Sequence, residues 1–227
     1  HVVKTEAYGP QIRGGESSCT VRMSAECIFD QGDFANILVA FNWADFGRFR
    51  GELVTSKNAV VLYDEADQTE IDPADVGTDG RDRWIAVPFA EIARQSAGTT
   101  QAKNIVTLGI LCEMFCLPEA PIRSAIAQKF EKKAAGILES NLRGFEAGID
   151  YAKRVQHDVR DFKFSYEKGD PKMLISGNEA AAAFTRQKDP FANPVGHSLR
   201  VGTAAIFEAL LAGDSVDRSD DAKSHPG

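Results

Sequence analysis

The stretch Ala59-Val-Val-Leu-Tyr63 is a continuous apolar run between Asn58 and Asp64. A strand with both faces buried has this pattern, whereas a strand with one exposed face alternates apolar and polar residues. The stretch Ile37-Leu-Val-Ala-Phe41 has the same character. Since the strands of parallel sheets are covered by helices on both faces, the two stretches predict a parallel sheet within an α/β domain.

Shorter strand patterns flank these two stretches. Trp84-Ile-Ala-Val87 is apolar and is followed by Pro88, which ends it. Cys19-Thr-Val-Arg-Met-Ser24 alternates as a half-buried strand does, and places Cys19, Val21 and Met23 on one face. His1-Val-Val3 has the pattern of the inside of a strand, so we expect the natural domain to begin upstream.

Helical patterns lie between and after the predicted strands. The clearest is an apolar stripe with spacings of four and three, which predicts a helix from Lys132 to about Val155. Its members are Leu138, Leu142, Phe145, Ile149 and Ala152. Further helices are expected at 42–54 in part, 89–94, 103–116 and 119–130. The predicted fold is therefore α/β, with a mostly parallel sheet and flanking helices.

The character of the chain changes near residue 156. Residues 1–155 form the predicted domain, and 156–172 form a charged linker. Residues 173–227 open with a strand-like stretch, Met173-Leu-Ile175, and continue as an irregular tail rich in Pro and Asp. A short helix at 204–211 is possible within this tail, and the polar end of the chain is predicted to be disordered.

Composition excludes some classes of function. Of 227 residues, 43% are hydrophobic and 26% charged, which is ordinary for a globular protein. The net charge of −7 argues against nucleic-acid binding and against attraction to an anionic membrane, since both require basic patches. No apolar run is long enough to cross a bilayer.

The cysteines predict a reducing environment. Cys19, Cys27, Cys112 and Cys116 are too few and too irregularly spaced for a disulfide scaffold. Cys112 and Cys116 lie four apart in an apolar helical stretch, where we expect buried structural thiols rather than metal ligands. This cysteine usage predicts a cytoplasmic protein.

A glycine-rich segment separates the first two strand patterns: Tyr8-Gly-Pro-Gln-Ile-Arg-Gly-Gly15. Gly9 and Pro10 favour a turn, and the Gly14-Gly15 pair permits backbone angles that side chains forbid. The guanidinium of Arg13 suits a carboxylate or a phosphate. From the residues alone, both a tight structural loop and a loop that admits a ligand or partner chain remain open.

The same segment resembles the Y-G-P-E-I-R-G-G element of the gamma domain of 2-oxoacid:ferredoxin oxidoreductases, with Gln11 where Glu is usual. The resemblance continues through Cys19-Thr-Val-Arg22, an N-x-x-x-L-G helix at Asn104 to Gly109, and a final helix ending at Phe145-Glu-Ala-Gly148. These matches cover residues 1 to about 153 in the family's order. The family's domain opens with a glycine-rich strand–turn–helix, so the resemblance implies that this first unit is missing here and the sheet is incomplete.

A second, shorter resemblance follows the linker. Ser176-Gly-Asn-Glu-Ala180 resembles the opening of the family's alpha domain, which follows the gamma domain in fused members. The Y-P-I-T-P motif expected next is absent, because the sequence departs from the pattern after about Ala183. The resemblance therefore implies a truncated or rearranged member of the gamma–alpha fused type.

The resemblance implies a component of an enzyme that decarboxylates a 2-oxoacid oxidatively, transfers the acyl group to coenzyme A and reduces ferredoxin. The fused type favours 2-oxoglutarate over pyruvate. Thiamine diphosphate, Mg²⁺ and iron–sulfur clusters are expected on partner alpha and beta domains, none being bound by this chain alone. Residues expected to face coenzyme A or the active site are Tyr8, Gly9, Arg13, Gly14 and Gly15, with Arg13 as the anion-binding group; no catalytic residue is assigned.

Two alternatives stay open. The chain could be an assembly or interaction module without chemistry of its own. Separately, the acidic cluster Asp64-Glu65-Ala-Asp67 follows a predicted buried strand, where ligands gather in open α/β sheets, but a solvated turn is the favoured interpretation, because acidic residues commonly occupy loops at strand ends. Trp43 and Phe46 could pack on the sheet or face a partner subunit.

Overall fold

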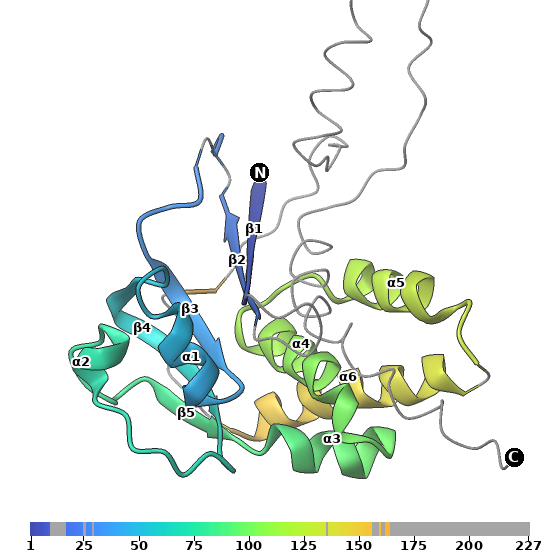
Figure 1. The fold of residues 1–227 in the computed structure, drawn as a ribbon. Coiled ribbons are helices and arrows are strands. Elements are labelled where there is room, and N and C mark those ends of the chain that lie inside the picture. Colours follow the sequence, from blue (N-terminus) through green and yellow to red (C-terminus); the bar gives the residue numbers. More distant parts are fainter. Residues whose placement is uncertain are drawn as a thin grey trace, which may run out of the picture.

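The computed structural model describes residues 1–9, 17–24, 26–28, 30–134, 136–155, 159 and 162–163. Within them, an α/β body stands beside a β-hairpin (Figure 1). The strands are β1 (Val2–Tyr8), β2 (Ser17–Met23), β3 (Ala35–Ala40), β4 (Thr55–Asp64) and β5 (Trp84–Val87). The helices are α1 (Trp43–Phe49), α2 (Pro73–Val76), α3 (Phe89–Ala97), α4 (Lys103–Met114), α5 (Glu119–Phe130) and α6 (Ile137–Arg154), with a 3₁₀ turn, η1 (Thr100–Ala102), before α4.

The parallel sheet confirms the predicted fold class. Its order is β3-β4-β5, with Leu62 of β4 beside Val39 on one side and Ile85 on the other. Val60 and Leu62 pack into the main core, whereas Val61, one residue out of phase, packs into a second cluster on the opposite face. The apolar run in β4 is therefore continuous because both faces of the strand are covered.

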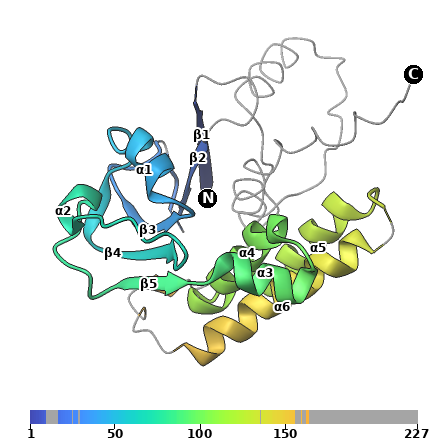
Figure 2. The same cartoon turned by 60° about the horizontal axis from the view of Figure 1, so that its bottom comes forward.

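Helices cover the two faces unequally. Helices α3, α4 and α6 contribute to the main core, and α1 and α2 contribute to the smaller cluster on the other face (Figures 1 and 2). Trp43 and Phe46 of α1 are buried in the smaller cluster, and Trp43 stacks on Trp84 with ring centroids 5.4 Å apart. The open question about these two aromatic residues is thus settled, because they pack on the sheet.

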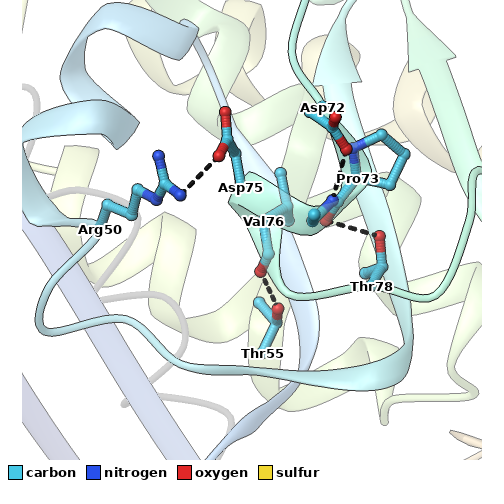
Figure 3. A network of polar contacts seen from close by, with 8 residues as sticks. Arg50, Thr55, Asp72, Pro73, Asp75, Val76 and Thr78 are labelled. Atoms are coloured by element: carbon cyan, nitrogen blue, oxygen red, sulfur yellow. Dashed lines mark hydrogen bonds and ion pairs between the residues drawn. The ribbon is translucent and has the colours of Figure 1, made fainter.

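The amino end of β4 is braced by α2. Thr55 donates its hydroxyl hydrogen bond to the Val76 carbonyl, and Arg50 forms an ion pair with Asp75 (Figure 3). Asp72 caps α2 by accepting a hydrogen bond from the Ala74 N–H at 2.9 Å. These contacts fix the segment that enters β4.

Helices α4 and α6 cross at very close range. A Cβ atom on Gly109 would lie 2.1 Å from the Phe145 carbonyl oxygen, and one on Gly148 would lie 2.1 Å from the Val106 carbonyl oxygen. Both positions therefore require glycine, because the backbones themselves are in contact. Gly144, on the same helix as Gly148, has only ordinary contacts, the nearest atom being 3.7 Å away.

Several predicted boundaries differ from the structure. Helix α6 begins at Ile137 instead of Lys132, because Gly136 adopts a left-handed conformation with φ of 86° at its N-terminus. Only Trp43–Phe49 of residues 42–54 is helical, with Asn42 as the N-cap. The first strand is longer than expected, and pairs with β2 as an antiparallel hairpin separate from the parallel sheet.

The prediction for Cys116 was wrong. Cys112 is buried and donates its thiol to the Leu117 carbonyl at 3.3 Å, as a structural thiol does. Cys116, however, is exposed, because α4 ends at Met114 and Cys116 takes the left-handed position after it, with φ of 56°. The predicted linker from 156 to 172 and the segment from 173 to 227 lie almost wholly outside the described residues.

Candidate functional site

The hairpin places Tyr8 and Gly9 at its closed end. Tyr8 is the last residue of β1 and stands opposite Ser17, the first residue of β2, and Gly9 follows directly. The structure thus confirms that the glycine-rich segment joins two strands. The other three predicted site residues, Arg13, Gly14 and Gly15, lie outside the described residues.

The Tyr8 side chain is 60% exposed, yet its hydroxyl is engaged. It donates a hydrogen bond of 2.8 Å to Oε2 of Glu6, while Oε1 of Glu6 lies 2.8 Å from Nζ of Lys4. The sequence reasoning missed Lys4 and Glu6. The alternation of Lys4, Glu6 and Tyr8 along one strand is the pattern that could have identified them, because such residues share a face.

These contacts shift the pKa values of Glu6 and Tyr8. The hydrogen bond from Lys4, followed by that from Tyr8, lowers the pKa of the Glu6 carboxyl. The same carboxylate raises the pKa of the Tyr8 hydroxyl, chiefly by accepting its hydrogen bond. Glu6 is therefore ionised and Tyr8 protonated at neutral pH; the phenol donates its one hydrogen to Glu6, so its oxygen can only accept a hydrogen bond from a further partner.

Cys19 lies opposite Glu6 in the hairpin ladder. Burial raises the pKa of its thiol to about 11. Because the thiolate is the reactive form of cysteine, Cys19 is a poor nucleophile at neutral pH. It therefore serves to pack the hairpin.

A groove of about 200 Å³ separates the hairpin from the body. Thr5, Ser18 and Thr20 line its hairpin side, and Phe34, Ala35 and Val54 line the side formed by the amino ends of β3 and β4. Phe34 and Val54 are 57% and 59% exposed. The groove thus lies at the amino ends of β3 and β4, whereas ligand sites of open α/β sheets usually lie at the carboxyl ends of the strands.

The acidic cluster at the carboxyl end of β4 accepts hydrogen bonds from the backbone. Asp67 accepts hydrogen bonds from the Trp43 N–H at 2.7 Å and the Thr69 N–H at 3.0 Å. Asp64 is buried and accepts from the Ala66 N–H at 3.1 Å. These carboxylates therefore hold the turn and the start of α1, which differs from a simply solvated turn.

The described part of the chain contains no group of three or more His, Cys, Asp or Glu side chains that could hold a metal ion. The residues present there do not fit a thiamine-bound Mg²⁺ or an iron–sulfur cluster, whose ligands are carboxylates and thiolates. Among the same residues, no helix combines the length and apolar character that a membrane span requires.

Comparison with known proteins identifies similar chains. The chain is 37% identical to the ketoisovalerate oxidoreductase subunit VorA of Methanothermobacter marburgensis over 151 residues, which is 65% of this chain and 30% of VorA. It is 29% identical to the 2-oxoglutarate synthase subunit KorC of Methanocaldococcus jannaschii over 157 residues, covering 67% of this chain and 78% of KorC.

A solved structure shares the fold. It is the 2-oxoglutarate:ferredoxin oxidoreductase from Magnetococcus marinus with 2-oxoglutarate, coenzyme A and succinyl-CoA bound. The TM-score is 0.59 at 25% identity, and the alignment covers 74% of this chain but 28% of that one. This chain thus spans less than a third of the length of VorA and of the solved chain.

The family model described as pyruvate ferredoxin/flavodoxin oxidoreductase matches residues 1–151. These residues include the hairpin, the parallel sheet and most of α6. The match, the relatives and the shared fold agree with the resemblance inferred from the glycine-rich segment, and the chain belongs to the pyruvate ferredoxin/flavodoxin oxidoreductase family.

Proposed function

We propose that this chain is a component of a 2-oxoacid:ferredoxin oxidoreductase and acts in coenzyme-A-dependent oxidative decarboxylation of a 2-oxoacid. The observation that carries the proposal is the family match over residues 1–151, which contains the hairpin with its glycine-rich end. The chemistry takes place on partner alpha and beta domains, and ferredoxin accepts the electrons. The four free cysteines support a cytoplasmic location.

The cofactors belong to the partner domains in this proposal. Thiamine diphosphate with Mg²⁺ would supply decarboxylation and the iron–sulfur clusters electron transfer, and the described residues offer no ligand set for either. Coenzyme A is the co-substrate that approaches this chain. Its recognition is assigned to Tyr8, Gly9, Arg13, Gly14 and Gly15, with the Arg13 guanidinium binding an anionic group of coenzyme A.

The substrate preference proposed is 2-oxoglutarate over pyruvate. It is supported by KorC, a 2-oxoglutarate synthase subunit, and by the solved enzyme with 2-oxoglutarate bound. VorA is a subunit of a ketoisovalerate oxidoreductase, so the relatives share the class of substrate and differ in its side chain.

The test is reconstitution of the full chain with its thiamine-binding and iron–sulfur partners. Reduction of ferredoxin is measured with 2-oxoglutarate, pyruvate and 2-oxoisovalerate, each with and without coenzyme A. We expect turnover to require coenzyme A and to be fastest with 2-oxoglutarate. In Arg13→Ala, the KM for coenzyme A should rise; an unchanged KM would remove Arg13 from the site.

The second candidate is an assembly module without a role in coenzyme A binding. The absence of a metal-ligand cluster among the described residues is compatible with it. In that case Tyr8→Ala and Arg13→Ala would weaken association of the subunits, measured by sedimentation, and would leave the KM for coenzyme A unchanged in the assembled enzyme.

A further inference from the structure

Three residues on one face of β1 form a continuous polar chain. Lys4, Glu6 and Tyr8 alternate along the strand, so their side chains project from the same face of the hairpin. The two oxygens of Glu6 are both engaged, one by the ammonium group of Lys4 and the other by the phenol of Tyr8, each at 2.8 Å. Glu6 is therefore the link between the other two residues.

The three side chains differ in exposure. Lys4 is half-buried, whereas Glu6 and Tyr8 are both exposed, Tyr8 to 60%. An exposed aromatic side chain ordinarily samples several rotamers, and a hydrogen bond to an anchored, charged acceptor restricts them. The ion pair of Lys4 with Glu6 therefore anchors the Tyr8 ring beside Gly9, where the glycine-rich segment begins.

We propose that Glu6 is a positioning residue, which holds Tyr8 in the orientation that contacts coenzyme A while Lys4 holds Glu6. This inference rests on the proposed function of Tyr8. Glu6 does not itself touch coenzyme A, because a carboxylate facing the phosphates of that co-substrate would repel them. The ion pair with Lys4 offsets the negative charge of Glu6 close to the site.

The hairpin fold does not depend on the Glu6 carboxylate. The strands pair in register over the whole of β1, from Val2 opposite Met23 to Tyr8 opposite Ser17. Val21 and Met23 attach the hairpin to the main core. Substitution of Glu6 should thus change the orientation of Tyr8 and leave the hairpin in place.

The test uses the assembled enzyme containing the full chain, with the variants Glu6→Ala, Glu6→Gln, Tyr8→Phe and Tyr8→Ala. Glu6→Ala should raise the KM for coenzyme A about 3- to 10-fold, the range expected for loss of one hydrogen bond, and leave kcat unchanged. Glu6→Gln should have a smaller effect, since the amide oxygen still accepts the phenol hydrogen. Glu70→Gln, the same change at an exposed position before α2, is the matched control.

A double-mutant cycle isolates the contact. Tyr8→Phe removes the hydroxyl and keeps the ring, so it should raise the KM by the same factor as Glu6→Ala, and the double variant should show no further rise. A multiplicative rise in the double variant would overturn the proposal, because Glu6 would then act independently of the hydroxyl.

A second measurement, on the full chain alone, reports the contact without turnover. The Tyr8 hydroxyl is titrated by NMR with ¹³C-labelled tyrosine, and Tyr8→Phe identifies its resonance. In Glu6→Ala the pKa of Tyr8 should fall toward its ordinary value of 10.0. An unchanged pKa together with an unchanged KM overturns the proposal.

The contact of Tyr8 with coenzyme A and the positioning role of Glu6 can be tested separately. If Tyr8→Ala raises the KM for coenzyme A and Glu6→Ala does not, the positioning role is wrong and the role of Tyr8 stands. If Tyr8→Ala leaves the KM unchanged, the proposed contact between Tyr8 and coenzyme A is itself wrong, and the positioning role is overturned with it.

Discussion

The hairpin and the α4–α6 pair represent opposite ways of building a structure. In the helix pair, Gly109 and Gly148 allow the two backbones to come into contact. The side chain of Phe145, whose carbonyl faces Gly109, is fully buried. In the hairpin, every residue of β1 and β2 is at least partly exposed, and only Val21 and Met23 pack against the main core. An isolated two-stranded hairpin is marginally stable in water, so this one depends on the body.

The two regions are suited to different roles, the helix pair to stability and the exposed hairpin to contacts with other molecules. A closely packed interface tolerates little change, because added volume displaces the backbone. An exposed hairpin can carry polar side chains and a glycine-rich loop at little cost to the core. The family marker lies on the hairpin, whereas the helix pair holds the body together, so mutations in the two regions should produce different losses.

The largest effect is expected at the helix crossing. Gly109→Ala should destabilise the chain by about 3 kcal/mol, because its Cβ would overlap the Phe145 carbonyl oxygen and force α4 and α6 apart. Urea unfolding followed by circular dichroism measures this. Gly144→Ala is the control and should be neutral or slightly stabilising, since alanine favours helix and the space is adequate. Equal losses at the two positions would contradict the packing described.

A matched pair of valines compares the two regions directly. Val60→Ala, at a fully buried position in β4, should cost about 2 kcal/mol through lost burial and a small cavity. Val21→Ala, in the half-buried hairpin, should cost about 1 kcal/mol or less. The two free energies of unfolding should be measured under the same conditions, and a larger loss at Val21 would show that the hairpin carries part of the core's stability.

Cys116→Gly should stabilise the body modestly. Cys116 occupies the left-handed position after α4, where the Leu117 N–H bonds to the Cys112 carbonyl at 2.9 Å and closes the helix end. Glycine relieves the strain that a side chain causes in this conformation, but it also raises the conformational entropy of the unfolded chain. The free energy of unfolding should therefore rise by only about 0.5 kcal/mol. Thermal unfolding of Cys116→Ala, which keeps the side-chain strain, is the comparison; a gain in both variants would exclude the backbone explanation.

The smallest effect is a pH dependence confined to the hairpin. The folded-state pKa of Glu6 is below its ordinary value of 4.5, so its contribution is fully present above pH 4.5 and is lost as the pH falls through the folded value. The protection of the β1 amides, which is the intrinsic exchange rate at each pH divided by the measured rate, should fall over that acidic range in the unmodified chain. Glu6→Gln should abolish this pH dependence in the hairpin. The protection of the α4 amides should be the same in the variant and in the unmodified chain.

The sequence predicted the sheet more accurately than the hairpin. The runs at 37–41 and 59–63 were recognisable because burial on both faces leaves an unbroken apolar stretch, and the structure places both in parallel strands. Residues Thr5 to Tyr8 were not recognised as strand, because this stretch has no apolar run and its polar side chains meet one another only once the strand is extended. The start of α6 was misplaced for a similar reason, since helical periodicity does not show where Gly136 turns the chain.

The site was only partly predictable. The roles of Tyr8 and Gly9 stay predictions from the glycine-rich motif, with the structure placing both residues at the end of the hairpin, and Lys4 and Glu6 belong to no motif. Likewise, an apolar helical context suggested burial for both Cys112 and Cys116, and only the position of the helix end separates them.

The sequence by itself determined the α/β class, the principal elements and the family marker, because these depend on local periodicity and on residue types that restrict the backbone. Only the tertiary structure decided the requirement for glycine at 109 and 148, the burial of Trp43 and Phe46, and the contact of Glu6 with Tyr8. The first two depend on distances between atoms of different elements, which packing fixes after the local structure has formed. The third depends on the extended conformation of β1, which pairing with β2 imposes.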